Sequence, residues 1–123
     1  MNISISDAEW IIMKALWQHE GEKMSLKEIA AETEGEGRSY TTVRTMVGRL
    51  VEKGAICADE TNPRNFLYSA AVSEETCRKE EMRSFIDRIF DGSAKLMVSS
   101  LIPGKNLTRE EQETLLELIE KME

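Results

Sequence analysis

One stretch of the sequence decides the fold: SYTTVRTMVGRLVEKG, residues 39–54. Ser39 is a favourable N-cap, because its hydroxyl accepts a hydrogen bond from the free amides of a first helical turn. Gly54 is a favourable end, because glycine adopts the left-handed conformation that terminates helices. Between them, apolar residues recur at helical spacing: Val43, Met46, Val47, Leu50 and Val51. The stretch therefore predicts an amphipathic helix.

The polar face of this helix suits DNA. It has hydroxyls near its N-terminus and basic residues further along, and Glu52 is its single acidic residue. Such helices bring their first turns to base edges in the major groove and their later charges to phosphates. The alternative, from this helix alone, is an ordinary solvated helix. The predicted DNA-binding residues here are Arg38, Ser39, Tyr40, Thr41, Thr42, Arg44, Thr45, Arg49 and Lys53.

Two further helices are predicted upstream. Residues 6–9 and 25–28 have the pattern of capping boxes, in which a serine and a glutamate satisfy each other's free amides. They predict a helix over 6–18 and a short helix over 25–33, with a glycine-containing turn at 34–37. A helix, a short helix, a turn and a basic helix follow one another in the order of a helix-turn-helix.

A hairpin is predicted behind the basic helix. Residues 55–58 and 65–69 have strand character, and turn-forming residues lie between them. A hairpin at this position is the wing of a winged helix. Arg64 lies near its tip, where it can reach a phosphate or the minor groove, so it joins the predicted DNA-binding residues. Cys57 is expected to be buried and inert.

The C-terminal residues predict amphipathic helices over 73–92 and 93–102, a stop at 103–104, and a last helix opened by a capping box within 107–111. These fifty-one residues are too few to enclose their large apolar side chains alone. A two-fold symmetric homodimer is the simplest remedy. The alternative is a monomer in which these helices fold back on residues 1–72. The predicted dimerisation residues are Met82, Phe85, Ile86, Ile89, Phe90, Leu96, Met97, Leu101, Leu115, Leu118, Ile119 and Met122.

The fold class is therefore predicted to be mostly α with a small β-hairpin. Residues 1–72 form a winged helix-turn-helix DNA-binding domain, and residues 73–123 form a helical dimerisation domain.

Composition limits the function classes. The net charge of −7 argues against nucleic acid, but residues 38–53 hold four basic residues and one acidic residue. This local reversal predicts weak non-specific DNA affinity and strong salt sensitivity. No apolar run approaches the roughly 18 residues of a membrane span, and no signal peptide is seen, so we expect a cytoplasmic protein. Two distant cysteines, 57 and 77, predict free thiols.

No feature of the sequence predicts an enzyme. It has no glycine-rich phosphate loop, no metal-ligand spacing and no Ser/His/Asp or Cys/His set, and His19 is its single histidine. We therefore expect no catalytic residue, no metal and no cofactor. The competing hypothesis is a winged-helix protein-interaction module whose basic helix binds an acidic partner.

Several motifs resemble the penicillinase-repressor family, which includes methicillin-resistance and copper-responsive repressors. They are ISDAEW (5–10), TVRTM (42–46) and RNFLY (64–68), with looser similarity as far as residues 107–111. The resemblance implies a winged-helix repressor that dimerises through C-terminal helices and binds dyad-symmetric operators near resistance genes. It also implies that residues 41, 42 and 44 face the bases and that Arg64 is the wing arginine.

The sequence departs from this family at two places. In the β-lactam branch, a membrane sensor's signal ends in proteolysis of the repressor at an Asn-Phe bond. The matching bond here is Ser100-Leu101, which makes it the candidate position for a sensor-linked protease. The copper branch has CxC motifs near the C-terminus, and this chain has no cysteine there, so we do not expect copper sensing by that route.

Overall fold

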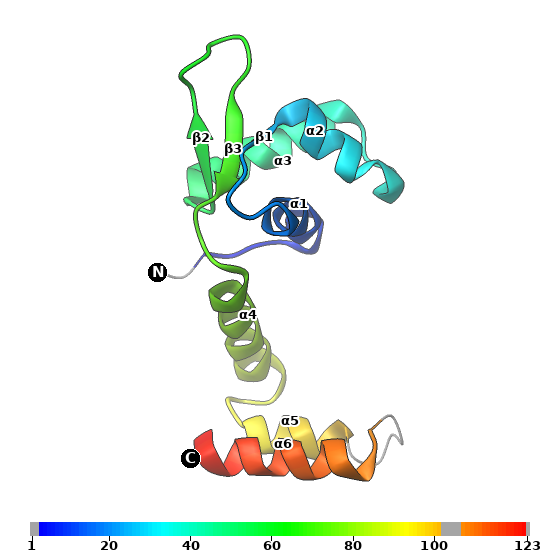
Figure 1. Cartoon of the computed structure of the whole chain (residues 1–123). Coiled ribbons are helices and arrows are strands. Elements are labelled where there is room, and N and C mark those ends of the chain that lie inside the picture. The colour runs from blue at the N-terminus through cyan, green and yellow to red at the C-terminus, as the bar shows by residue number, and fades with distance from the viewer. Residues whose placement is uncertain (1–2, 102–106, 123) are drawn as a thin grey trace. The chain divides into compact units, whose positions relative to one another are not determined.

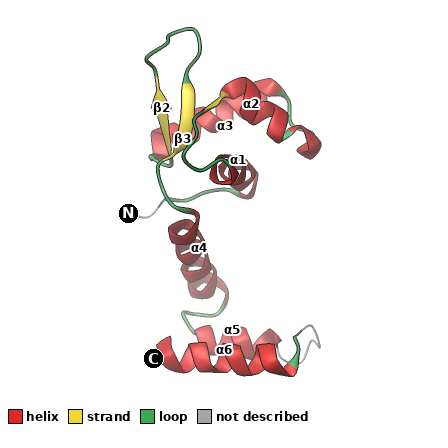
Figure 2. Ribbon diagram, in the orientation of Figure 1, coloured by secondary structure: helices red, strands yellow, loops and turns green. Residues whose placement is uncertain are grey.

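The computed structural model describes residues 3–101 and 107–122, which form helices and one small sheet (Figure 1, Figure 2). It divides into two compact units, Met1–Arg78 and Lys79–Glu123, which are treated separately below. The elements are α1 (Asp7–Gln18), β1 (Met24–Ser25), α2 (Leu26–Glu32), the short 3-10 helix η1 (Glu34–Glu36), α3 (Tyr40–Lys53), β2 (Ile56–Asp59), β3 (Leu67–Ala70), α4 (Glu74–Ile89), α5 (Ala94–Leu101) and α6 (Arg109–Met122).

The helix ends of the first unit follow the predicted caps. Ser6 and Ser25 complete capping boxes at the starts of α1 and α2. The hydroxyl of Ser39 accepts a hydrogen bond of 3.2 Å from the amide of Thr42 at the start of α3. Gly54 ends α3 at φ 84°, a conformation that favours glycine. The fold class predicted from the sequence is confirmed.

The sheet has three antiparallel strands, in the order β1-β3-β2, rather than the predicted hairpin of two. Ser25 of β1 and Asp59 of β2 both pair with Leu67, on opposite sides of β3. The prediction missed β1 because this strand has only two residues and Ser25 also caps α2. Figure 1 shows the loop between β2 and β3 projecting beyond the helices of this unit. β2, this loop and β3 form the wing.

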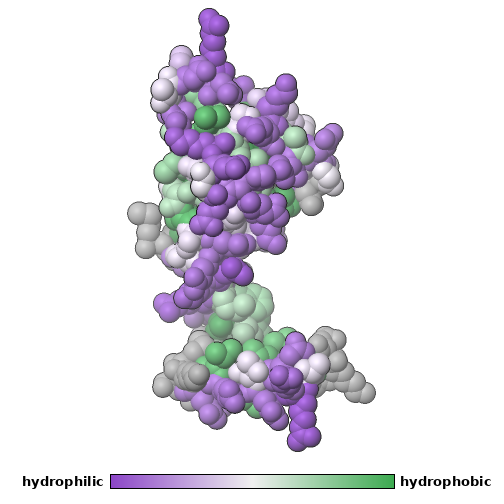
Figure 3. All heavy atoms as spheres, viewed as in Figure 1, coloured by the Kyte–Doolittle hydropathy of each residue, from purple (hydrophilic) through white to green (hydrophobic). Residues whose placement is uncertain are grey.

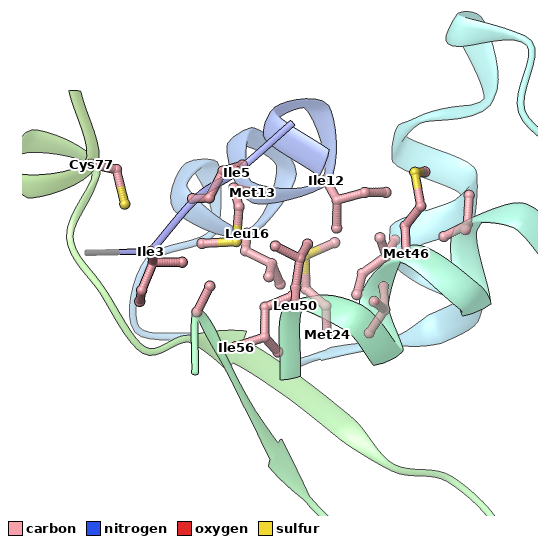
Figure 4. Close-up of a cluster of buried hydrophobic side chains, with 14 residues drawn as sticks. Ile3, Ile5, Ile12, Met13, Leu16, Met24, Met46, Leu50, Ile56 and Cys77 are labelled. Atoms are coloured by element: carbon pink, nitrogen blue, oxygen red, sulfur yellow. The ribbon is translucent and has the colours of Figure 1, made fainter. Parts of the chain in front are cut away.

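The core of the first unit is one apolar cluster between α1, β1, α2, α3 and the start of β2 (Figure 4). Trp10 and Trp17 pack against it with their rings edge to face, 5.3 Å between centroids. The largest fully enclosed side chains are Ile12, Met13, Ile29, Val43, Val47 and Leu50.

The two cysteines differ in exposure. Neither forms a disulfide, as predicted, and Cys77 is buried in the core cluster. The prediction that Cys57 is buried is wrong, because its side chain is exposed. Ile56 takes the inward position on β2, and the alternation of a strand then turns Cys57 outward.

The helices of the second unit also begin at side-chain caps. The hydroxyl of Ser93 accepts a hydrogen bond from the amide of Leu96, and residues 108–111 form the predicted capping box of α6. Residues 91–92, at φ 49° and 82°, turn the chain between α4 and α5. The predicted stop at 103–104 lies outside the described residues. None of the described helices is both long and apolar enough to cross a bilayer.

Candidate nucleic-acid interface

The polar face of α3 points away from the core. Val43, Met46, Val47 and Leu50 hold the helix by its apolar face. The opposite face is exposed to solvent. It includes five of the predicted DNA-binding residues: Thr41, Thr42, Arg44, Thr45 and Arg49. Tyr40, the first helical residue, is 52 % exposed.

Local hydrogen bonds orient the hydroxyls of this face. The Oγ of Ser39 lies 3.0 Å from the Oγ1 of Thr42. The Oγ1 of Thr45 donates a hydrogen bond of 3.0 Å to the carbonyl of Thr41. Because its hydroxyl hydrogen is bound to the backbone, Thr45 offers an external partner its methyl group and oxygen lone pairs.

A groove of about 550 Å³ lies between the first turn of α2, the N-terminal half of α3 and the wing. We call it the wing groove. Three of its nine lining residues are cations and none is acidic, in a chain with 23 acidic residues. Two other hollows of the same unit each contain acidic residues. The lining residues of the wing groove are Leu26, Lys27, Tyr40, Arg44, Pro63, Arg64, Asn65, Phe66 and Tyr68.

The cations of the wing groove, Lys27, Arg44 and Arg64, form no ion pair with any residue that the structure describes. The same is true of Arg49 further along α3. Sequence reasoning selected Arg44 and Arg64 but missed Lys27, Phe66 and Tyr68. The position of Lys27 in the first turn of α2 was the available signal, because a helix-turn-helix places this turn beside the recognition helix.

Hydrogen bonds at its base and tip hold the wing. Lys23, just before β1, reaches across β3 and brings its Nζ to 2.6 Å from the Oδ2 of Asp59. Asp59 also accepts hydrogen bonds from the hydroxyl and amide of Thr61. The hydrogen bond from Lys23, with those from Thr61, holds the pKa of Asp59 well below its usual range. At the tip, the amide of Arg64 donates to the Oδ1 of Asn62 at 3.0 Å.

Lys53 has an internal role that the sequence did not predict. Its Nζ lies 2.6 Å from the Oε1 of Glu9 and donates a 2.8 Å hydrogen bond to the carbonyl of Ser4. Burial opposes ionisation of Glu9, but hydrogen bonds from Lys53 and Ser6 keep the pKa of this carboxyl below its ordinary value. Lys53 therefore fastens the end of α3 to the start of α1, and its predicted contact with DNA stays a prediction. Arg38 is half-buried and interacts within the structure.

The second unit exposes apolar side chains. Six of the twelve predicted dimerisation residues are between 41 % and 58 % exposed: Met82, Phe85, Ile89, Leu96, Leu101 and Leu118. Leu116, which was not predicted, is 46 % exposed. Figure 3 shows apolar atoms at the surface of these helices, whereas the visible surface of the first unit is mainly hydrophilic.

The other predicted dimerisation residues are less accessible or lie outside the description. Ile86 is buried. Phe90, Met97 and Leu115 are half-buried. The side chains of Ile119 and Met122 lie outside the described part of the structure. Ser100 is exposed, and its hydroxyl donates to the carbonyl of Met97 within the last turn of α5.

Comparison with known proteins identifies the family of this chain. A family model described as "Penicillinase repressor" matches residues 5–121. A penicillinase repressor from Bacillus licheniformis is 30 % identical over 118 residues, covering 95 % of this chain and 90 % of the relative. The methicillin resistance regulatory protein MecI of Staphylococcus aureus (strain N315) is 27 % identical over 119 residues, covering 95 % and 94 %.

Solved structures show the same fold at lower identity. A mutant of MepR from S. aureus, bound to an oligodeoxyribonucleotide, has a TM-score of 0.50 at 21 % identity and covers 96 % of this chain and 77 % of that chain. Another MepR mutant has a TM-score of 0.51, also at 21 % identity, with the same coverage. Both neighbours are winged-helix regulators. The chain belongs to the penicillinase repressor family, a family of winged-helix transcriptional repressors and not of enzymes.

Proposed function

We propose that this protein is a homodimeric repressor that binds a dyad-symmetric DNA operator of an antibiotic-resistance or stress-response gene. The observation that carries the proposal is the wing groove beside the exposed face of α3. Its lining has three cations that form no ion pair with the described residues, and it has no acidic residue, although the chain as a whole has a net charge of −7. The names of the relatives, a penicillinase repressor and a methicillin resistance regulator, support a resistance gene as the target.

Base reading is assigned to the first turns of α3. Arg44 can form two hydrogen bonds with guanine, which discriminate against other bases by about 1–3 kcal/mol, and threonine methyls can contact thymine. Thr41 and Thr42 are exposed at this end of the helix. Contacts with the phosphate backbone are assigned to Ser39, Tyr40 and Arg49, and Arg64 is assigned to a phosphate or the minor groove.

The dimer is assigned to the second unit. Seven large apolar side chains of its described part are exposed, and extensive apolar exposure marks interaction surfaces in soluble proteins. A second copy would bury them by a two-fold axis, at roughly 25 cal/mol per Å² of apolar surface removed from water. Two recognition helices would then enter successive major grooves about 34–36 Å apart, and the bound dimer would exclude the polymerase.

Release of the operator is assigned to a sensor-linked protease acting at Ser100-Leu101. Both residues are exposed and lie in the last turn of α5. Because the hydroxyl of Ser100 is bonded within that turn, cleavage requires the turn to unwind. Leu101→Pro should resist cleavage in cells that respond to the inducer. Cleavage elsewhere in the chain would contradict this assignment.

A salt-dependent binding titration tests the proposed function. The protein is titrated with the DNA upstream of its own gene and with a scrambled duplex of equal length. We expect two protomers for each bound duplex, preference for the native sequence and steep weakening with salt. Equal or absent binding to both duplexes would contradict the proposal and favour a winged-helix module that binds an acidic protein.

A further inference from the structure

The position of the wing groove indicates what occupies it when DNA is bound. In the proposed complex, α3 lies in the major groove and the wing reaches the phosphates or the minor groove beside it. A single sugar-phosphate strand separates these two grooves of a duplex. That strand must therefore pass between α3 and the wing, which is where the wing groove lies.

The lining of the wing groove suits a sugar-phosphate strand. One cation comes from each of three elements: Lys27 from α2, Arg44 from α3 and Arg64 from the wing. A strand with a negative charge at every nucleotide can engage cations at several points, and the absence of carboxylates removes repulsion. The rings of Tyr40 and Tyr68 add apolar walls for deoxyribose and hydroxyl donors for phosphate oxygens.

We propose that the wing groove holds this strand and that Lys27 is a sequence-independent phosphate anchor, which makes α2 a third DNA-binding element. The inference rests on the proposed function. Lys27 is exposed and unpaired within the described part of the chain, and it lies two residues after Ser25. Ser25 is paired with Leu67 of β3 and caps α2, so the backbone that carries Lys27 is fixed to the wing.

An ammonium group acts on phosphate as a point charge, whereas an arginine fork also suits guanine. Lys27 should therefore strengthen binding to all DNA sequences equally, while Arg44 should discriminate between them. This difference separates an anchor from a residue that reads bases, and it can be measured on the intact protein.

The experiment compares Lys27→Gln with Lys14→Gln, which removes another exposed lysine of the first unit that does not line the wing groove. Lys27→Gln should weaken binding to the native and scrambled duplexes by the same factor. It should also reduce the slope of log K against log salt by about 0.9 for each bound protomer. Between roughly 50 and 200 mM salt, the ratio of wild-type to variant affinity should therefore change by about threefold for each protomer. Lys14→Gln should keep the wild-type slope, and Lys27→Arg should restore it.

Two results are distinguishable. If the wild-type protein binds the native duplex preferentially but Lys27→Gln keeps its slope and affinity, the inference about Lys27 is wrong and the proposed function stands. If the wild-type protein shows no preference and no salt dependence, both are overturned. Thermal unfolding of each variant confirms that the fold is intact, so that a lost slope reports the removed charge.

Discussion

The two units of this protein differ in how far they bury their apolar side chains. The first unit has a core of fully enclosed side chains, including Ile12, Val43 and Leu50, each at 0 % exposure. In the second unit only Ile86 and Val98 are buried among the described apolar residues, and Ile89 is 58 % exposed. A unit with a closed core can fold from its own residues, whereas a unit with exposed apolar faces gains stability from a partner.

This difference assigns the two parts of the proposed function. In the proposed complex, the closed first unit would supply the recognition helix and wing for each half of an operator. The second unit would set the distance between two such readers by joining two copies. Substitutions in the first unit should therefore change its stability or its affinity for DNA. Substitutions on the exposed apolar face of the second unit should instead change self-association.

The largest effect is expected from a cavity in the closed core. Leu50→Ala removes a fully enclosed side chain of α3. It should lower the free energy of unfolding by about 2–5 kcal/mol, since such a cavity collapses only in part. Chemical denaturation measures this loss, which should be the same at low and high protein concentration. A loss below about 0.5 kcal/mol would contradict the closed core.

A charge on the exposed face of the second unit should instead break self-association. Leu96→Glu places a carboxylate at a residue that is 53 % exposed and predicted to lie in the dimer interface. Enclosing an unpaired charge costs several kcal/mol, so the dimer dissociation constant should rise at least a hundredfold. Sedimentation measures this constant. The control is Lys95→Glu, an exposed neighbour on α5 outside the predicted set, which should remain dimeric.

Removing the proposed base-reading arginine tests whether the first unit discriminates between DNA sequences. Arg44→Ala should lower affinity for the native duplex by about 1–3 kcal/mol, and affinity for scrambled DNA by less, because a bidentate contact with guanine is lost. Fluorescence anisotropy on both duplexes measures the difference. Equal losses on the two duplexes would contradict base reading and leave Arg44 as a phosphate contact.

The smallest effect concerns the Lys53–Glu9 ion pair, which fastens α3 to α1. Glu9→Gln should lower the free energy of unfolding by about 1.5 kcal/mol at neutral pH, the low end for a hydrogen bond to a charged group, because Lys53 stays partly exposed. The pKa of Glu9 is depressed in the folded state, so this stability is present above the ordinary glutamate pKa. It is lost as the pH falls through the folded value.

Denaturation at a series of pH values measures this effect. The difference in the free energy of unfolding between the wild type and Glu9→Gln should disappear as the pH is lowered. Glu20→Gln, which changes an exposed glutamate, should match the wild type throughout. A gap that is independent of pH would show that the ionised carboxylate of Glu9 is not what stabilises the contact.

Local patterns predicted much of the first unit because its helices begin and end at residues with specific chemistry. Ser6, Ser25, Ser39 and Gly54 mark the ends of three helices, and the apolar spacing of α3 predicts its buried face. β1 was missed because two residues are too few to show a strand pattern, and its pairing with β3 comes from tertiary structure.

The candidate site was predicted in part for the same reason. The outward face of α3 follows from helical periodicity, which selected Arg44. Neither the wing groove nor the engagement of Lys53 follows from periodicity, since each depends on elements distant in the sequence. Lys53 meets Glu9 across 44 positions, and Lys27 approaches the wing only because β1 pairs with β3.

Hydroxyl-radical footprinting of the upstream DNA tests the central claim most directly, since it reports both units at once. The account predicts two protected half-sites related by a dyad, with centres one helical turn of about 10–10.5 base pairs apart, or a multiple of it. The Leu96→Glu variant should fail to protect both half-sites at protein concentrations at which the wild type protects both. A single protected half-site, or no protection at saturating protein, would contradict a dimer that reads DNA through its first unit.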